Sequence, residues 1–219
     1  MHAFRDVEIV TYCPRKLYYH RQSPEEVETP VTVEAKRDLA FRYPELLTDE
    51  VELEAAPIDV TPTQYRSNLG CARARLDCWE DIADPAARDV YVRGRDCHGI
   101  VHKVPRTDAP TLSLVFGGRP PRQGIWQPQS VRLVAAAKAI SWERETDVER
   151  AFAEYPAYGV VREIEIDARR TATYRAAVRT ASAIDGPPAR TNQRSKCTPC
   201  EFQPRCGVRT RSLRSLLGG

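Results

Sequence analysis

Residues 88–118, "RDVYVRGRDCHGIVHKVPRTDAPTLSLVFGG", indicate the architecture of the chain. Three runs rich in β-branched and aromatic residues lie here, separated by Gly94 and by the Pro-containing stretch 105–110, which is typical of consecutive strands. The Ala-rich segment 130–145 follows without helix breakers and predicts a helix. Further along we expect a shorter helix at 147–154, a strand at 158–166 and a helix at 172–184. This order predicts an α/β fold with a mixed central sheet flanked by helices.

The composition favours a cytoplasmic protein with no membrane association. Hydrophobic residues make up 42% of the 219 residues, and no run approaches the ~20 apolar residues of a membrane span. Residues 1–16 have neither the basic start nor the apolar core of a signal peptide. Arginine outnumbers lysine by 28 to 5, and arginine forms paired hydrogen bonds with phosphate and carboxylate groups. The charge is therefore compatible with a nucleic-acid partner.

The chain divides into segments of different composition. Residues 1–22 and 172–184 have helical spacing. Residues 23–85 form a helical, partly acidic region, in which positions 25–59 carry eleven acidic and three basic residues. Residues 86–185 hold the predicted α/β core. The tail, residues 186–219, carries seven basic residues and one acidic residue.

The cysteines point to a metal site. An odd count of seven, in a chain without an export signal, argues against a disulfide framework. Cys197, Cys200 and Cys206 are spaced C-x2-C-x5-C with prolines between them, and thiolate sites usually have four ligands. Cys13, in a "YCPRK" turn followed by aromatic residues, is the best candidate for the fourth. The other three are interpreted as small apolar residues of the core: Cys71, Cys78 and Cys97.

The combination of "YCPRKLYY" at 12–19, the α/β core and "CTPCEFQPRC" at 197–206 resembles the RecB-like nucleases that carry an iron–sulfur cluster, and most closely the CRISPR-associated Cas-four family. The resemblance covers nearly the whole chain except the acidic stretch 25–59. It implies a restriction-endonuclease-like PD-(D/E)XK core, and a helical iron–sulfur region that joins residues 1–22 to residues 186–219. It also implies a four-iron (4Fe-4S) cluster, with zinc as the alternative. The implied ligands are Cys13, Cys197, Cys200 and Cys206.

The carboxylates that such nucleases use are missing at the matching positions. Enzymes of this family hold Mg²⁺ or Mn²⁺ with an Asp on one strand and a Glu-x-Lys on the next, and the cation activates water. On that pattern His102 takes the place of the Asp, Phe116 that of the Glu and Gly118 that of the Lys. On the following helix, Arg132 and Ala136 take the places of a Gln and a Tyr. We therefore expect no Mg²⁺ or Mn²⁺ site for cleavage.

The sequence thus predicts a pseudonuclease that binds DNA, single-stranded by resemblance, or a partner protein of CRISPR adaptation or DNA repair, without cleaving. The predicted DNA contacts are Arg119, Arg122, Trp126 and Arg132.

Two alternatives remain open at this stage. One is an active single-stranded DNA exonuclease with relocated acids, for which the candidates are Asp96, Asp108 and Glu143. The other is a protein-interaction subunit in which a four-cysteine site has a structural role only.

Overall fold

The computed structural model describes residues 1–23, 31–48 and 52–207. Parts of the acidic stretch 25–59 and of the basic tail therefore lie outside the described residues. The helices are α1 (Phe4–Tyr12), α2 (Pro14–Gln22), α3 (Val31–Asp38), α4 (Tyr43–Leu46), α5 (Pro62–Arg75), α6 (Trp79–Ala83), α7 (Gln127–Arg144), α8 (Ala168–Ser182), α9 (Arg194–Cys197) and α10 (Gln203–Cys206). Three 3-10 turns are η1 (Leu39–Phe41), η2 (Leu53–Ala55) and η3 (Pro156–Tyr158). The strands are β1 (His2–Ala3), β2 (Ala87–Arg93), β3 (Cys97–Val104), β4 (Ser113–Val115), β5 (Arg150–Tyr155) and β6 (Val160–Glu165).

The described strands form one six-stranded mixed sheet; the sequence predicts a mixed sheet and four of its strands, but neither β1 nor β5. Its order is β1-β3-β4-β5-β6, and β2 pairs with β3 outside this path. The β2–β3, β3–β4 and β5–β6 pairs are antiparallel, whereas β4 and β5 are parallel and are connected through α7. Gly94, in the β2–β3 turn, lies against α7, where a Cβ atom would come within 2.7 Å of the Cα of Ala139. The hairpin can therefore approach the helix only because this residue has no side chain.

The helix predicted at 147–154 is wrong, because Arg150–Tyr155 is the strand β5. Its alanine and glutamate residues favour a helix in isolation. Here β4 and β6 pair with it on both sides, and five of its six residues are buried. Tertiary context overrides local propensity, and the segment becomes an interior strand of the sheet.

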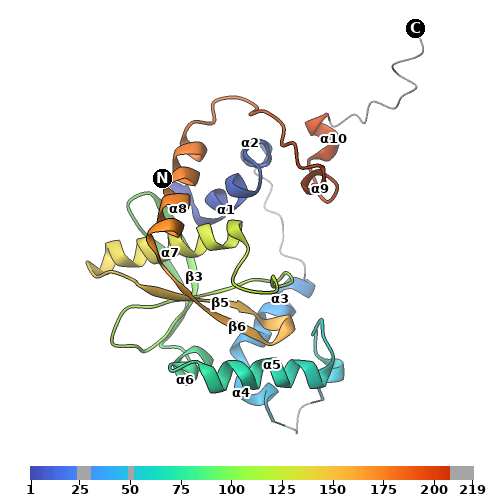
Figure 1. Cartoon of the computed structure of the whole chain (residues 1–219), viewed down its shortest axis with the longest axis vertical. Coiled ribbons are helices and arrows are strands. Elements are labelled where there is room, and N and C mark those ends of the chain that lie inside the picture. Colours follow the sequence, from blue (N-terminus) through green and yellow to red (C-terminus); the bar gives the residue numbers. More distant parts are fainter. Residues whose placement is uncertain (24–30, 49–51, 208–219) are drawn as a thin grey trace, which may run out of the picture.

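Each face of the sheet carries its own hydrophobic core. Helices α1, α7 and α8 cover one face, where Phe4, Val7 and Leu133 are buried. The helical region from η1 to α6 covers the other face, with Tyr65 and Trp79 among its buried side chains. Figure 1 shows the sheet between these two layers, with α4, α5 and α6 on one side and α1, α7 and α8 on the other.

A buried ion pair joins the second layer to the sheet. Lys103 on β3 and Glu154 on β5 are both fully buried, with 2.8 Å between Nζ and Oε2. The same Nζ donates to the carbonyl oxygens of Ala40 and Ile82, and the Ser113 hydroxyl donates to the other oxygen of Glu154. Because each charged group has several partners, the pair is fully satisfied and fixes the helical region to the sheet.

The first two long helices and the last two described helices lie together. Figure 1 shows α1 and α2, from the N-terminal end, beside α9 and α10 from the C-terminal end. None of the described helices is both long and apolar enough to cross a membrane.

We expect Lys103→Met to lower the free energy of unfolding by about 3–5 kcal/mol, because it leaves the buried Glu154 carboxylate without its partner. The double substitution Lys103→Met/Glu154→Leu removes both charges, so it should cost less than the sum of the two single substitutions, by about 0.5–3 kcal/mol. Urea denaturation measures these differences.

Arg42→Ala is the matched control, since Arg42 pairs with Glu45 at 2.9 Å where both side chains are about half exposed. Its cost should not exceed about 1 kcal/mol. Equal costs for Lys103→Met and Arg42→Ala, or strict additivity in the double variant, would contradict a structural role for the buried pair.

Candidate metal centre and adjoining surface loop

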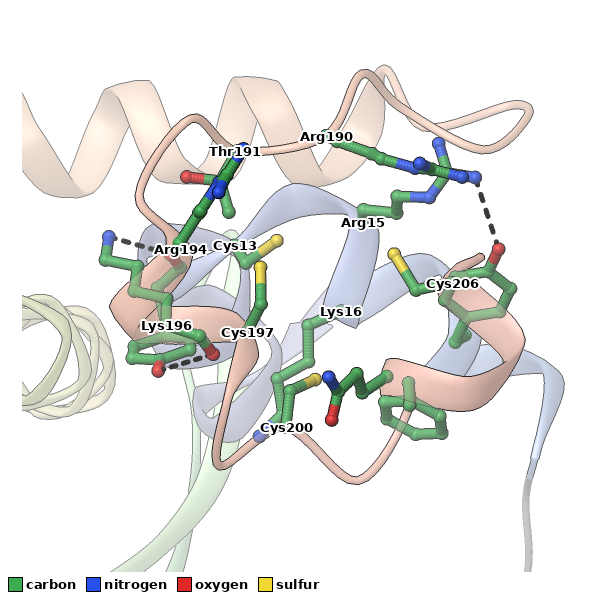
Figure 2. Close-up of a pocket in the computed structure, with 14 residues that line it drawn as sticks. Cys13, Arg15, Lys16, Arg190, Thr191, Arg194, Lys196, Cys197, Cys200 and Cys206 are labelled. Carbon is green, nitrogen blue, oxygen red and sulfur yellow. Dashed lines mark hydrogen bonds between the residues drawn. The ribbon is translucent and has the colours of Figure 1, made fainter. Parts of the chain in front are cut away.

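The four predicted ligand cysteines line one cavity. Cys13 stands between α1 and α2, Cys197 ends α9, Cys200 lies in the turn that follows, and Cys206 ends α10. All four contribute to the wall of a cavity of about 240 Å³, and none forms a disulfide. Figure 2 shows their side chains spread around this cavity. The structure thus brings together four thiols from the two ends of the chain.

Hydrogen bonds between the chain ends hold the cysteines in place. Tyr12 donates from its hydroxyl to the carbonyl oxygen of Lys196, and the Lys196 Nζ donates to the carbonyl oxygen of Tyr12, each at 3.0 Å. Arg15 donates to the carbonyl oxygen of Pro188 at 2.8 Å. The Tyr19 ring stacks on Phe202 with 5.9 Å between centroids. These contacts fix α2 against the C-terminal segment beside the cavity.

The local sequence explains how three thiols face one cavity. The N–H of Cys200 bonds to the carbonyl oxygen of Cys197 at 3.1 Å, which closes a tight turn around Thr198 and Pro199. Helix α10 then ends at Gly207, whose φ of 61° is left-handed, and a Cβ atom there would lie 2.8 Å from an Arg190 side-chain nitrogen. Only glycine ends the helix at this point without displacing Arg190.

Positive charge surrounds the thiols. The basic side chains that line the cavity, among the described residues, are Arg15, Lys16, Arg190, Arg194 and Lys196. Burial, followed by the nearby sulfur groups, raises the pKa of the Tyr12 phenol above its usual range. Cysteines bind metals as thiolates, and cations in the wall would offset the negative charge of such a group.

A zinc ion and an iron–sulfur cluster can both be held by four cysteine ligands. Among the residues that the structure describes, no group of three or more His, Cys, Asp or Glu side chains is placed so that it could hold one metal ion. The four cysteines line one cavity, and this arrangement is compatible with either group.

The remaining cysteines lie away from this cavity. Cys78 and Cys97 are buried, as predicted, and burial raises the pKa of each thiol to about 11. The prediction that Cys71 is buried is wrong, because it lies on the exposed face of α5. Helix α5 ends at Arg75, before Cys78, so Cys71 and Cys78 do not lie on one helix face.

Three of the five positions matched to catalytic residues lie together. Phe116 follows β4 and packs on Tyr155, and the Arg132 guanidinium lies over its ring at 5.8 Å from the centroid. His102, on β3, is buried near Arg132. The other two positions do not join this group: Gly118 is exposed in the loop after β4, and Ala136 is fully buried in α7.

His102 has a structural role between two strands. Its Nδ1 accepts a hydrogen bond from the backbone N–H of Val115 at 2.8 Å, so the neutral ring carries its proton on Nε2. Burial is the main cause, and nearby basic side chains the next, of a fall in the pKa of His102 to about 3. The ring is therefore uncharged at physiological pH.

The three proposed replacement acids do not all lie together. Asp96 lies in the β2–β3 turn and Asp108 beyond the other end of β3, a strand ~23 Å long. Glu143, near the end of α7, accepts a hydrogen bond from the backbone N–H of Arg93 at 2.6 Å. Arg93 ends β2 and leads into the turn, so Glu143 lies at the same end of the hairpin as Asp96, whereas Asp108 lies at the other end.

Two acidic residues that sequence analysis missed pair with the arginines whose charges act on His102. Glu8 on α1 accepts a hydrogen bond from Arg132 at 3.2 Å, and Asp89 on β2 pairs with Arg37 of α3. Each carboxylate is thus paired with an arginine. The residues are 124 and 52 positions from their partners, so no local pattern could have revealed them.

The predicted DNA-contact residues lie mainly on the loop between β4 and α7. Arg119, Arg122 and Trp126 are exposed, and the Trp126 Nε1 donates to the carbonyl oxygen of Arg119 at 2.8 Å. Arg132 lies apart from them, half-buried and paired with Glu8. Arg162 on β6, which sequence analysis missed, holds the loop by hydrogen bonds to the carbonyl oxygens of Pro121, Arg122 and Gly124.

Comparison with known proteins adds no relative on which a function could be based. No protein-family model matches the chain, and no curated protein sequence is significantly similar to it.

Proposed function

We propose that the protein is an iron–sulfur protein with a degenerate, RecB-like nuclease fold, related to the Cas-four family, which binds single-stranded DNA or a DNA-processing partner without cleaving it. The observation that carries the proposal is the cavity lined by Cys13, Cys197, Cys200 and Cys206. Residues up to 193 positions apart in the chain supply these thiols. Four thiols gathered from both ends, with basic side chains around them, suit an anionic metal cluster better than a core of apolar residues.

The fold supports the same proposal. Strands β2, β3 and β4 are consecutive and antiparallel, and α7 then crosses to β5, which is parallel to β4. This succession is the one that the resemblance to the PD-(D/E)XK core implies. Fold does not fix function, so the activity is argued from the site.

The residues at the former cleavage positions favour binding without hydrolysis. His102 is neutral and bonded to Val115, Phe116 is apolar and packed on Tyr155, and Arg132 contributes a positive charge. A hard cation such as Mg²⁺ requires oxygen ligands, and the carboxylates of Glu8 and Asp89 in this region are paired with arginines. Arginines can still attract the phosphate groups of nucleic acid.

The loop after β4 supplies the groups for DNA binding. Trp126 is 51% exposed, and the bond from its Nε1 to the Arg119 carbonyl oxygen fixes the orientation of the ring. An exposed, oriented indole can stack on a base, and the neighbouring arginines can contact the backbone. Arg162 keeps the loop in this conformation.

The cluster, when bound, supplies covalent bonds between the two chain ends and a redox-active group. The four cysteines would hold it. Arg15, Lys16 and Lys196 would offset the negative charge of the thiolates. Tyr12 and Phe202, which line the same cavity, would limit the access of water.

Anaerobically purified protein should be brown, with broad absorption in the visible range. It should contain iron and acid-labile sulfide in equal amounts, on the order of four irons per chain. Cys13→Ser should lower the iron content severalfold and lower the unfolding temperature, because it removes the one ligand from the N-terminal end. Metal analysis and thermal denaturation measure these effects.

Cys71→Ser is the matched control, since Cys71 is exposed and distant in sequence from the four ligands. It should keep both the iron and the unfolding temperature of the wild type. Colourless anaerobic protein with one zinc per chain would instead establish a structural four-cysteine site, and equal iron loss from both variants would contradict the ligand assignment.

The wild-type protein should bind a single-stranded oligonucleotide without degrading it in Mn²⁺ or Mg²⁺. Trp126→Ala should weaken the binding by about 1–3 kcal/mol, because stacking on one base is lost. Fluorescence anisotropy measures the affinity, and gel analysis of the same oligonucleotide detects cleavage.

Trp142→Ala provides the control, because Trp142 is 60% exposed at the opposite end of α7. It should leave the affinity unchanged. Metal-dependent turnover that is abolished by Glu8→Gln or Glu143→Gln would establish an active nuclease with relocated acids, contrary to the proposal.

A further inference from the structure

A hollow lined by arginines lies beside the β4–α7 loop and extends to the end of α5. It has a volume of about 510 Å³, and its wall includes Arg75 from the end of α5, Arg122 from the loop and Arg162 from β6. The buried side chain of Leu76 and the loop residue Gly124 also contribute to the wall. Three arginines from three separate elements thus line one hollow.

Arg162 carries a charge that no described acidic group offsets. It is half-buried, and it donates hydrogen bonds to neutral carbonyl oxygens, at 2.8 Å for Pro121 and 3.3 Å for Arg122. Burial is the main cause of a lowered pKa for Arg162, and the charge of Arg75 lowers it further. A partly desolvated cation beside a second cation is unfavourable unless an anion is present.

The other charged residues that line the hollow do not offset the positive charge of Arg162. Arg75 and Arg122 are exposed and form no ion pair with any described residue. The one acidic residue in the wall is Glu163, and it lies 3.5 Å from Arg150. The hollow therefore has an excess of positive charge within the described structure.

We propose that Arg75, Arg122 and Arg162 form a binding site for a phosphate group of the single-stranded nucleic acid. The inference rests on the proposed function and extends the DNA-contact surface from the loop to the end of α5. Guanidinium groups form paired hydrogen bonds with phosphate oxygens, and Arg162 retains N–H groups that its three carbonyl partners do not use.

The position of the hollow favours a phosphodiester over a small free anion. It opens beside the loop that carries Trp126, so a base stacked on the indole and a phosphate in the hollow can belong to one strand. Its volume of about 510 Å³ also exceeds what one phosphate group needs, which leaves space for the adjoining sugar. Phosphate contacts of this kind position a strand and make its binding depend on salt.

The test compares two arginines of the last turn of α5. Arg75→Ala should weaken single-stranded DNA binding several-fold at low salt, and the slope of log affinity against log salt should become shallower by about 0.7, as expected for the loss of one phosphate contact.

Arg73→Ala is the control, because Arg73 is exposed and its side chain lies 3.9 Å from Glu80. It is two residues from Arg75, on another side of the helix. It should change the slope much less. Arg75→Lys should retain part of the salt dependence.

The outcomes separate this inference from the proposed function. DNA binding that depends on Trp126 but responds equally to Arg75→Ala and Arg73→Ala would overturn the phosphate site alone. A wild-type protein that does not bind DNA at all would overturn the proposed function. Inorganic pyrophosphate serves as a further probe. It could raise the unfolding temperature of the wild type but not that of Arg75→Ala, while neither Arg75→Ala nor Arg73→Ala changes the affinity for DNA. In that case the hollow binds a free phosphate compound and the phosphodiester proposal is wrong.

Discussion

The contact between the two ends of the chain is the constraint on which the candidate site depends. The reciprocal hydrogen bonds of Tyr12 and Lys196 join residues 184 positions apart, and they lie next to the cysteine cavity. Closing so long a loop costs conformational entropy, which a few hydrogen bonds at a partly exposed surface offset only in part. A metal group bound by Cys13 and the three C-terminal cysteines would offset much more of it. The proposed metal group would therefore act as a cross-link between these two segments.

The sequence predicts the sheet, the helices around it and the gathering of the four cysteines, because each depends on local pattern or on spacing. It does not predict β5, whose alanines and glutamate favour a helix until strands pair on both sides. The Lys103–Glu154 pair and the Arg162 contacts also escape prediction, since their partners are 51 and about 40 positions away. Lone charged residues in a strand give no signal that they are buried. What sequence misses here are long-range polar contacts, which only the folded chain can bring together.

The surroundings of Phe116 bear on the proposed absence of cleavage. The resemblance implies lost carboxylates here, and the structure adds that arginines lie in the same region, with Arg132 over Phe116 and Arg37 paired with Asp89. Arg132 is likewise paired with Glu8, so arginines already engage both carboxylates. On the proposed function, such a region is a poor site for a divalent cation, which requires free oxygen ligands.

The cysteine cavity and the DNA-contact loop are connected through two packed helices. Helix α1 ends at Tyr12, directly before Cys13, and packs along α7, to which the Glu8–Arg132 ion pair also links it. Helix α7 begins directly after Trp126, so its position sets where the indole and the loop arginines lie. A cluster that fixes the end of α1 would therefore stabilise the helix pair that supports the loop. On the proposed function, this gives a reason for a protein that does not cleave DNA to retain four cysteines: the bound group would support the DNA-contact loop.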